Sequence, residues 1–150
     1  MHARPQGPSV GQVLARMDED WAAFRGRIAA IPLERLADPL GDGAWSRKQM
    51  LAHIVTWHDL TVDRLSRFAE SGEPQGLEGD ADAINARAAR AAEGRTTGEI
   101  LLALDDSFRR LRRVVVRLSD GQLYVHDGWA AAVIAGNSYD HYAEHRADLD

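Results

Sequence analysis

The chain has 150 residues, of which 45% are hydrophobic and none is cysteine, and its formal net charge is −5. This is the length of one ordinary domain, so we expect residues 1–150 to form a single domain with its own core. The lack of cysteine excludes disulfides, thiolate metal sites and a cysteine nucleophile, and it fits a cytoplasmic location.

The sequence also argues against membrane and nucleic-acid partners. No apolar run approaches the roughly 18 residues of a membrane span, and the opening MHARPQGPSV is typical of a frayed tail. An acidic chain needs a local basic stripe to bind nucleic acid, and RRLRR at 109–113 is the candidate. On a helix these arginines spread around most of the circumference, so we interpret them as a solvated face.

The first half of the chain is predicted to form two long helices. Apolar residues recur every three or four positions from about 9 to 31, which predicts an amphipathic helix that ends at Pro32. The segment 37–44, ADPLGDGA, is rich in helix breakers. Ser46 and Gln49 then form a capping box, which predicts a second helix to about residue 71 with Gly72 as its C-cap.

The second half continues the helical pattern. Residues 71–79 read as a loop, and Asp80 can cap a short alanine-rich helix over 81–93. Thr96 and Glu99 form another capping box, which opens a third long helix through Leu118. We expect a connection over 119–128 and a fourth long helix over 129–149. No segment alternates with period two, so the prediction is all-α: a four-helix bundle with one extra short helix between its second and third helices.

Two histidines lie four residues apart on the last predicted helix. His141 and His145 therefore project about 40° apart on one face. The same line is apolar earlier in the helix, at Ala130 and Ile134, and then becomes polar at Asn137. A solvated face would carry charges along this line, whereas an apolar line that ends in imidazoles is typical of a ligand site between helices.

A metal site of this kind usually needs a third protein ligand. The candidates are His53 and His58 on the second helix, which lie about 140° apart and cannot face the same metal. The helical wheel alone does not choose between them. His53 lies roughly 10 Å into its helix, which matches the level of the histidine pair better if the two helices are antiparallel, so we favour His53. His2 and His126 fall in a tail and a connection and are interpreted as incidental.

The string HYAEH also matches the inverted zincin motif H-x-x-E-H. That motif needs a further ligand well downstream, and only five residues follow His145. We therefore do not expect a peptidase. Glu144 has two possible interpretations: a group that orients a histidine, or a solvated side chain.

Two segments resemble a known family. The segment GAWSRKQMLAHIVTWHD at 43–59 and the segment VIAGNSYDHYAEH at 133–145 are similar to the helix-two and final-helix signatures of the DinB-like superfamily. The second segment is most similar to the ClbS/DfsB branch. The resemblance implies a four-helix bundle with up-down-down-up connectivity, and it places His53, His141 and His145 at the family's three metal-ligand positions. At position 58 that branch often has glutamate, so no role is carried to His58.

The resemblance also implies a function. The superfamily includes metal-dependent thiol transferases and isomerases, and one member of the closest branch opens a reactive cyclopropane electrophile. The leading hypothesis is a metal-dependent hydrolase or thiol transferase that acts on an electrophilic small molecule, in a detoxifying or self-protective role. Three imidazoles suit Zn, Ni or Fe(II), and any thiol must be a soluble low-molecular-weight cofactor because the chain has no cysteine.

Other readings remain open at this stage. The bundle could be a non-catalytic module that binds or sequesters a small molecule, or a structural dimerisation module, and a homodimer is open in either case. Four side chains are candidates to shape or hydrogen-bond a substrate: Trp45, Asn137, Tyr139 and Tyr142.

Overall fold

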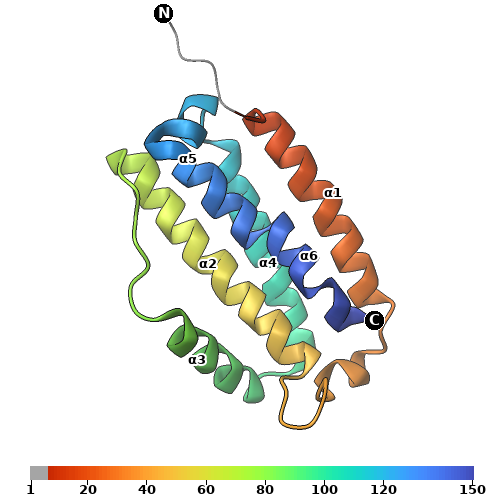
Figure 1. The fold of residues 1–150 in the computed structure, drawn as a ribbon. Coiled ribbons are helices and arrows are strands. Elements are labelled where there is room, and N and C mark those ends of the chain that lie inside the picture. The colour runs from red at the N-terminus through yellow and green to blue at the C-terminus, as the bar shows by residue number, and fades with distance from the viewer. Residues whose placement is uncertain (1–6) are drawn as a thin grey trace, which may run out of the picture.

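The computed structural model describes residues 7–150, and within that range it contains helices and no strand. The helices α1 (Val10–Ala29), α2 (Arg47–Ser71) and α4 (Thr97–Val116) lie side by side with the pair α5 (Asp120–Asn137) and α6 (Tyr139–His145) (Figure 1). The all-α prediction is confirmed. The other helices are α3 (Ala81–Glu93) and the short 3₁₀ helices η1 (Leu33–Ala37) and η2 (Arg146–Leu149).

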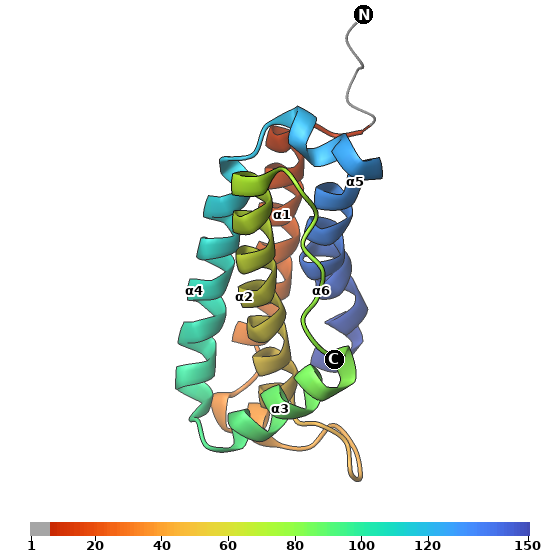
Figure 2. The same ribbon diagram turned by 90° about the vertical axis from the view of Figure 1, so that its left-hand side faces the viewer.

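The predicted short helix α3 packs on the outside of the bundle against α2. The connection that follows α2 runs back along the bundle, so that α3 lies beside the beginning of α2 and not beside its end (Figure 2). The side chain of Gln49 contributes to this placement, because its Nε2 donates to the carbonyl of Ala89 at 3.2 Å. The extra helix therefore covers the part of α2 that carries His53.

The predicted helix starts are present. Ser46 Oγ accepts from the backbone N–H of Gln49 at 3.1 Å, while Gln49 Oε1 accepts from the backbone N–H of Ser46 at 3.0 Å. Thr96 and Glu99 make the equivalent pair at the start of α4. Gly72 ends α2 in the left-handed conformation, with φ of 75°, which glycine adopts without steric cost.

The last part of the chain differs from the prediction of one helix over 129–149. A helical turn begins earlier, at Asp120, and a non-helical stretch at 125–128 separates it from the rest of α5. A second interruption occurs at Ser138, whose φ of −132° and ψ of −106° are not helical. Its hydroxyl donates to the carbonyl of Ile134, a local bond of the kind that competes with the helix ladder. The predicted helix is thus divided into α5 and α6, and its last turn is the 3₁₀ helix η2.

The core follows the apolar stripes that the sequence predicts. Fully buried side chains come from α1, α2, α4 and α5, and include Met17, Leu51, Ile54, Leu65, Leu104, Leu111 and Ile134. No helix within residues 7–150 is both long and apolar enough to cross a membrane.

A histidine interrupts the buried stripe of α2. His58 is 0% exposed, so both of its ring nitrogens need partners inside the protein. Its Nδ1 lies 2.8 Å from Ser107 Oγ, and its Nε2 lies 2.7 Å from the hydroxyl of Tyr142. The Ser107 hydroxyl donates to the carbonyl of Leu104 at 3.0 Å, so its oxygen accepts from Nδ1–H. The Nε2 of His58 is therefore the acceptor, and the hydroxyl of Tyr142 donates to it.

This arrangement holds His58 in its neutral form. Burial, followed by the charges of His141 and Arg110, lowers the pKa of His58 to about 3. In the unfolded chain the same group titrates near 6.5. Below that pH the unfolded state binds a proton that the folded state does not bind, so the free energy of unfolding falls as pH decreases from 6.5 towards 3.

Replacement of His58 by glutamine isolates this effect. A glutamine amide offers one acceptor and one donor but does not titrate, so we expect His58→Gln to lose less stability in acid than the wild type. One proton corresponds to a slope of about 1.4 kcal/mol per pH unit. Urea unfolding measured over the interval from pH 6.5 towards 3 tests the prediction, and parallel curves for the two proteins would contradict it.

Candidate metal centre

Three imidazoles from α2 and α6 meet at one point between the helices. The Nε2 of His141 lies 2.9 Å from the Nε2 of His53 and 3.1 Å from the Nε2 of His145. The nitrogens that these three side chains can offer to a metal lie within 4.8 Å of one another. His53 and His141 are buried, at 8% and 7% exposure, and His145 is partly exposed.

The local fold explains the convergence. His53 lies two turns inside α2, after the Ser46 cap, and His141 and His145 share one face of α6 because they are four residues apart. The structure therefore brings together the three histidines that the sequence analysis selected. It places His58 on a different side of α2, in the core. His126 is exposed, with its Nε2 2.7 Å from the carbonyl of Gly72, and His2 lies outside the described residues.

The outer nitrogens of two of these rings have acceptors. The Nδ1 of His53 lies 2.9 Å from Oδ1 of Asn85, which also accepts from the indole N–H of Trp57 at 2.7 Å. The Nδ1 of His145 lies 2.9 Å from Oδ2 of Asp148. A carboxylate or amide oxygen accepts hydrogen bonds, so both Nδ1 atoms carry the hydrogen, and the lone pairs of both Nε2 atoms face the centre.

Asp148 is itself held in place by a residue that lies 101 positions earlier in the sequence. The guanidinium of Arg47, at the first position of α2, donates to the carbonyl of Asp148 at 2.7 Å and to that of Asp150 at 3.0 Å. The start of α2 thus fixes the turn that orients His145. Neither Asn85 nor Asp148 was predicted. The spacing of three residues between His145 and Asp148 was a usable signal, whereas no pattern in the sequence pointed to Asn85.

The hydrogen bonding of the cluster fits a cation. Two Nε2 lone pairs point towards the Nε2 of His141, which can supply one hydrogen at most. If it does so, the Nδ1 of His141 becomes an acceptor, and this buried atom has no hydrogen-bond partner among the described residues. A cation at the centre would pair with all three Nε2 atoms at once. A set of three imidazoles suits a divalent first-row metal such as Zn, Ni or Fe(II).

The pKa values of the buried ligands favour the same state. Burial is the largest cause that lowers the pKa of His53, followed by the charge of His145, against smaller opposing effects of Asn85 and Glu144. Burial, then His53 and His145, lower the pKa of His141 to about 3. Both rings are therefore neutral at physiological pH, which is the form that binds metals.

An open cleft of about 460 Å³ gives access to the three imidazoles. Trp45, whose ring centroid lies 5.5 Å from that of His53, lines the cleft, and so does Trp57. Asn85 of α3 and Asn137 at the end of α5 also line the cleft, together with Glu144, which is exposed. Trp45 and Asn137 were among the candidate substrate contacts, and the cleft places both beside the cluster.

The two candidate tyrosines do not line this cleft. Tyr142 is buried and hydrogen-bonded to His58, as described above. Tyr139 lies beneath the guanidinium of Arg16, whose Cζ is 4.1 Å from the ring centroid. Both tyrosines therefore contact the protein itself, and Tyr142 in particular is a core residue.

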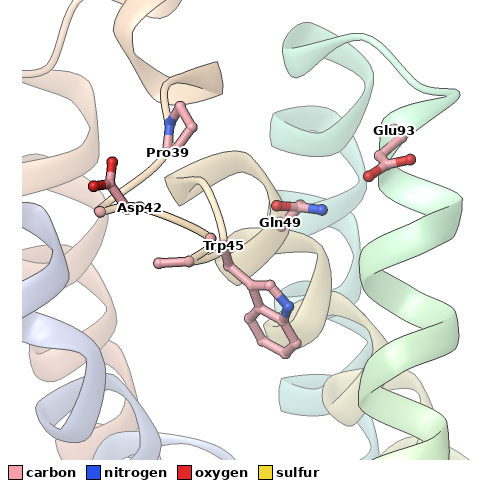
Figure 3. A pocket seen from close by; sticks show the side chains of 8 residues that line it. Pro39, Asp42, Trp45, Gln49 and Glu93 are labelled. Carbon is pink, nitrogen blue, oxygen red and sulfur yellow. The ribbon is translucent and has the colours of Figure 1, made fainter.

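A second hollow of about 600 Å³ is also bordered by Trp45. It is lined by the loop that precedes α2 and by the end of α3, and its polar side chains are Asp42, Gln49 and Glu93. Figure 3 shows Trp45 between Asp42 on one side and Glu93 on the other. Trp45 thus lines both this hollow and the cleft that leads to the histidines.

Comparison with known proteins relates this fold and site to a family. A model described as DinB superfamily matches residues 16–147, a range that includes His53, His141 and His145. No curated protein matches the sequence. A crystal structure of a protein from Streptococcus pneumoniae is similar, with a TM-score of 0.79, 12% sequence identity and coverage of 96% of this chain and 90% of that chain. At that identity the likeness shows a common fold alone. Because the family match extends over most of its length, the chain belongs to the DinB superfamily.

Proposed function

We propose that the protein binds a divalent first-row metal through the Nε2 atoms of His53, His141 and His145, and that it acts on an electrophilic small molecule in the adjoining cleft. The observation that carries the proposal is the convergence of the three Nε2 atoms, with two of the rings oriented from behind by Asn85 and Asp148. Membership of the DinB superfamily supports it. The reaction is that of a hydrolase or a thiol transferase, with Zn, Ni or Fe(II) as the metal.

The metal would supply Lewis acidity, which polarises an electrophile and makes a bound water or thiol more acidic. The residues of the chain supply the rest. The three imidazoles would hold the ion, and the cleft that they border would give a substrate access to it. Trp45 and Trp57 offer apolar faces that exclude water and pack against the substrate, and the amide of Asn137 offers a polar contact. A thiol would enter from solution, because the chain has no cysteine.

The proposal extends to the finer classification of the chain. The string GNSYDHYAEH at 136–145 supports a place in the ClbS/DfsB branch, with His58 as a departure from it. Up-down-down-up connectivity is part of the proposal, and the colour order of Figure 1 supports it, because α1 and α6 run one way while α2 and α4 run the other. We also propose one domain over residues 1–150, a cytoplasmic location and a small-molecule partner.

Metal content is the first test. Untagged wild-type protein is expected to carry close to one metal ion per chain by elemental analysis, and His53→Ala, His141→Ala and His145→Ala are each expected to lose it. His126→Asn is the matched control, because this histidine lies outside the cluster and asparagine tolerates its positive φ of 54°. If the wild type binds no metal even after reconstitution with Zn, Ni and Fe(II), the metalloenzyme is excluded and a metal-free binding or structural bundle is left.

The reaction type needs a separate experiment. Metal-loaded protein is incubated with strained-ring electrophiles, with and without a low-molecular-weight thiol, and the products are identified by mass spectrometry. A product to which the elements of water have been added identifies a hydrolase, and a thioether product identifies a thiol transferase. Tight stoichiometric binding without product would instead identify a sequestering protein.

The role of Asn85 gives a further prediction. Its Oδ1 fixes the ring of His53, so Asn85→Leu is expected to weaken zinc binding roughly tenfold or more, as outer partners of metal ligands commonly do when they are removed. Competition with a chelator measures the affinity. Asn85→Asp keeps the acceptor oxygen and is expected to remain close to the wild type. Arg87→Leu, an exposed position of the same helix, is the control. Equal affinity for Asn85→Leu and wild type would contradict the prediction.

A further inference from the structure

Two of the three candidate ligands lie on a helix that is too short to be stable by itself. The helix α6 has seven residues and follows the non-helical Ser138. Isolated helices of this length are not stable in water, because nucleation costs more than so few hydrogen bonds return. The position of His141 and His145 relative to α2 must therefore come from contacts that α6 makes with the other helices.

Two adjacent residues of α6 reach α2 at two separate positions. His141 meets His53 through their Nε2 atoms at 2.9 Å, and Tyr142 meets His58 through its hydroxyl at 2.7 Å. Adjacent residues of a helix point about 100° apart, and residues five apart point about 140° apart. The two contacts therefore lie on different sides of the interface, and together they define the rotation and the register of α6 against α2.

The contact of Tyr142 is complete without a metal. The tyrosine hydroxyl donates to Nε2 of His58, the Nδ1–H of His58 donates to Ser107, and Ser107 donates to the carbonyl of Leu104. The direction of each bond is determined by the last carbonyl, which can only accept. Tyr142, His58 and Ser107 are 1%, 0% and 0% exposed, so water cannot replace a lost partner.

Aromatic packing closes the surroundings of the tyrosine. The ring of Tyr142 lies 5.2 Å from that of Phe24 and 5.4 Å from that of Trp21, measured between centroids. Trp21 also packs against His58, at 5.9 Å. The tyrosine is thus held by α1 through its ring and by α2 through its hydroxyl, and α4 contributes indirectly through the bond between Ser107 and His58.

We propose that the Tyr142–His58–Ser107 chain is a positioning device that sets α6 against α2 before metal binds, and so places His141 opposite His53. The inference rests on the metal site proposed above. It assigns to His58 a role other than ligand, and it makes Tyr142 and His58 determinants of metal affinity although neither residue touches the metal position.

The test compares four variants. Tyr142→Phe removes only the hydroxyl and leaves the Nε2 of His58 without a partner. His58→Leu removes both bonds of the ring, whereas His58→Gln keeps an acceptor for Tyr142 and a donor for Ser107. Tyr139→Phe is the matched control, because it removes a hydroxyl from the same helix outside the chain of bonds. Each protein is checked for folding by circular dichroism without metal, and is then titrated with Zn²⁺ against a chelator and with Co²⁺ for its d–d absorption band.

We expect Tyr142→Phe and His58→Leu to bind Zn²⁺ roughly tenfold or more weakly than the wild type, with an altered Co²⁺ band. His58→Gln and Tyr139→Phe are expected to keep both properties. If Tyr142→Phe and His58→Leu are less stable but bind Zn²⁺ and Co²⁺ as the wild type does, the hydrogen bonds of Tyr142, His58 and Ser107 serve packing alone and the inference is overturned. If the wild type itself binds neither ion, the proposed metal site fails and the inference fails with it. The two failures are distinguished by the wild-type titration.

Discussion

A neutral imidazole carries one N–H donor and one acceptor nitrogen, and four such rings lie close together between the helices of this protein. Their hydrogen bonds constrain much of the interior. His58 is satisfied by hydroxyls from α4 and α6, and its Nε2 acts as an acceptor. His53 and His145 present acceptor nitrogens to one point because Asn85 and Asp148 accept from their other sides. One set of bonds is complete within the protein, and the other leaves three Nε2 atoms that face one another with too few hydrogens to pair them all.

The sequence predicted the elements that depend on local interactions. The capping boxes of α2 and α4 and the apolar stripes of the long helices are properties of neighbouring residues, and the structure contains them. The choice between His53 and His58 was harder, because the helical wheel of α2 gave both a place near the core. The residues that hold His58 in the core are Ser107 and Tyr142, which are 49 and 84 residues away from it in the sequence. The wheel could not contain that information, and only the family resemblance and the depth argument favoured His53.

Other features followed from tertiary contacts that no local pattern encodes. The break at Ser138 is not encoded by the serine alone, because the hydroxyl of Ser107 makes a similar bond to the carbonyl of Leu104 within the continuous helix α4. The short helix α3 was predicted, but its place beside the start of α2 was not. That place depends on how the preceding loop returns along the bundle and on the bond between Gln49 and Ala89. Because of it, a helix on the outside of the bundle provides Asn85 to the candidate site.

The position of Trp45 has a consequence for how related proteins can come to differ in the ligands that they accept. The candidate ligands are carried by α2 and α6, whereas this indole comes from the residue just before the Ser46 cap and lines both the cleft and the hollow that is bordered by Asp42 and Glu93. A smaller residue at position 45 would change the lining of both spaces without removing any hydrogen bond of the three imidazoles. The range of ligands can therefore change during evolution through a single codon while His53, His141 and His145 stay the same.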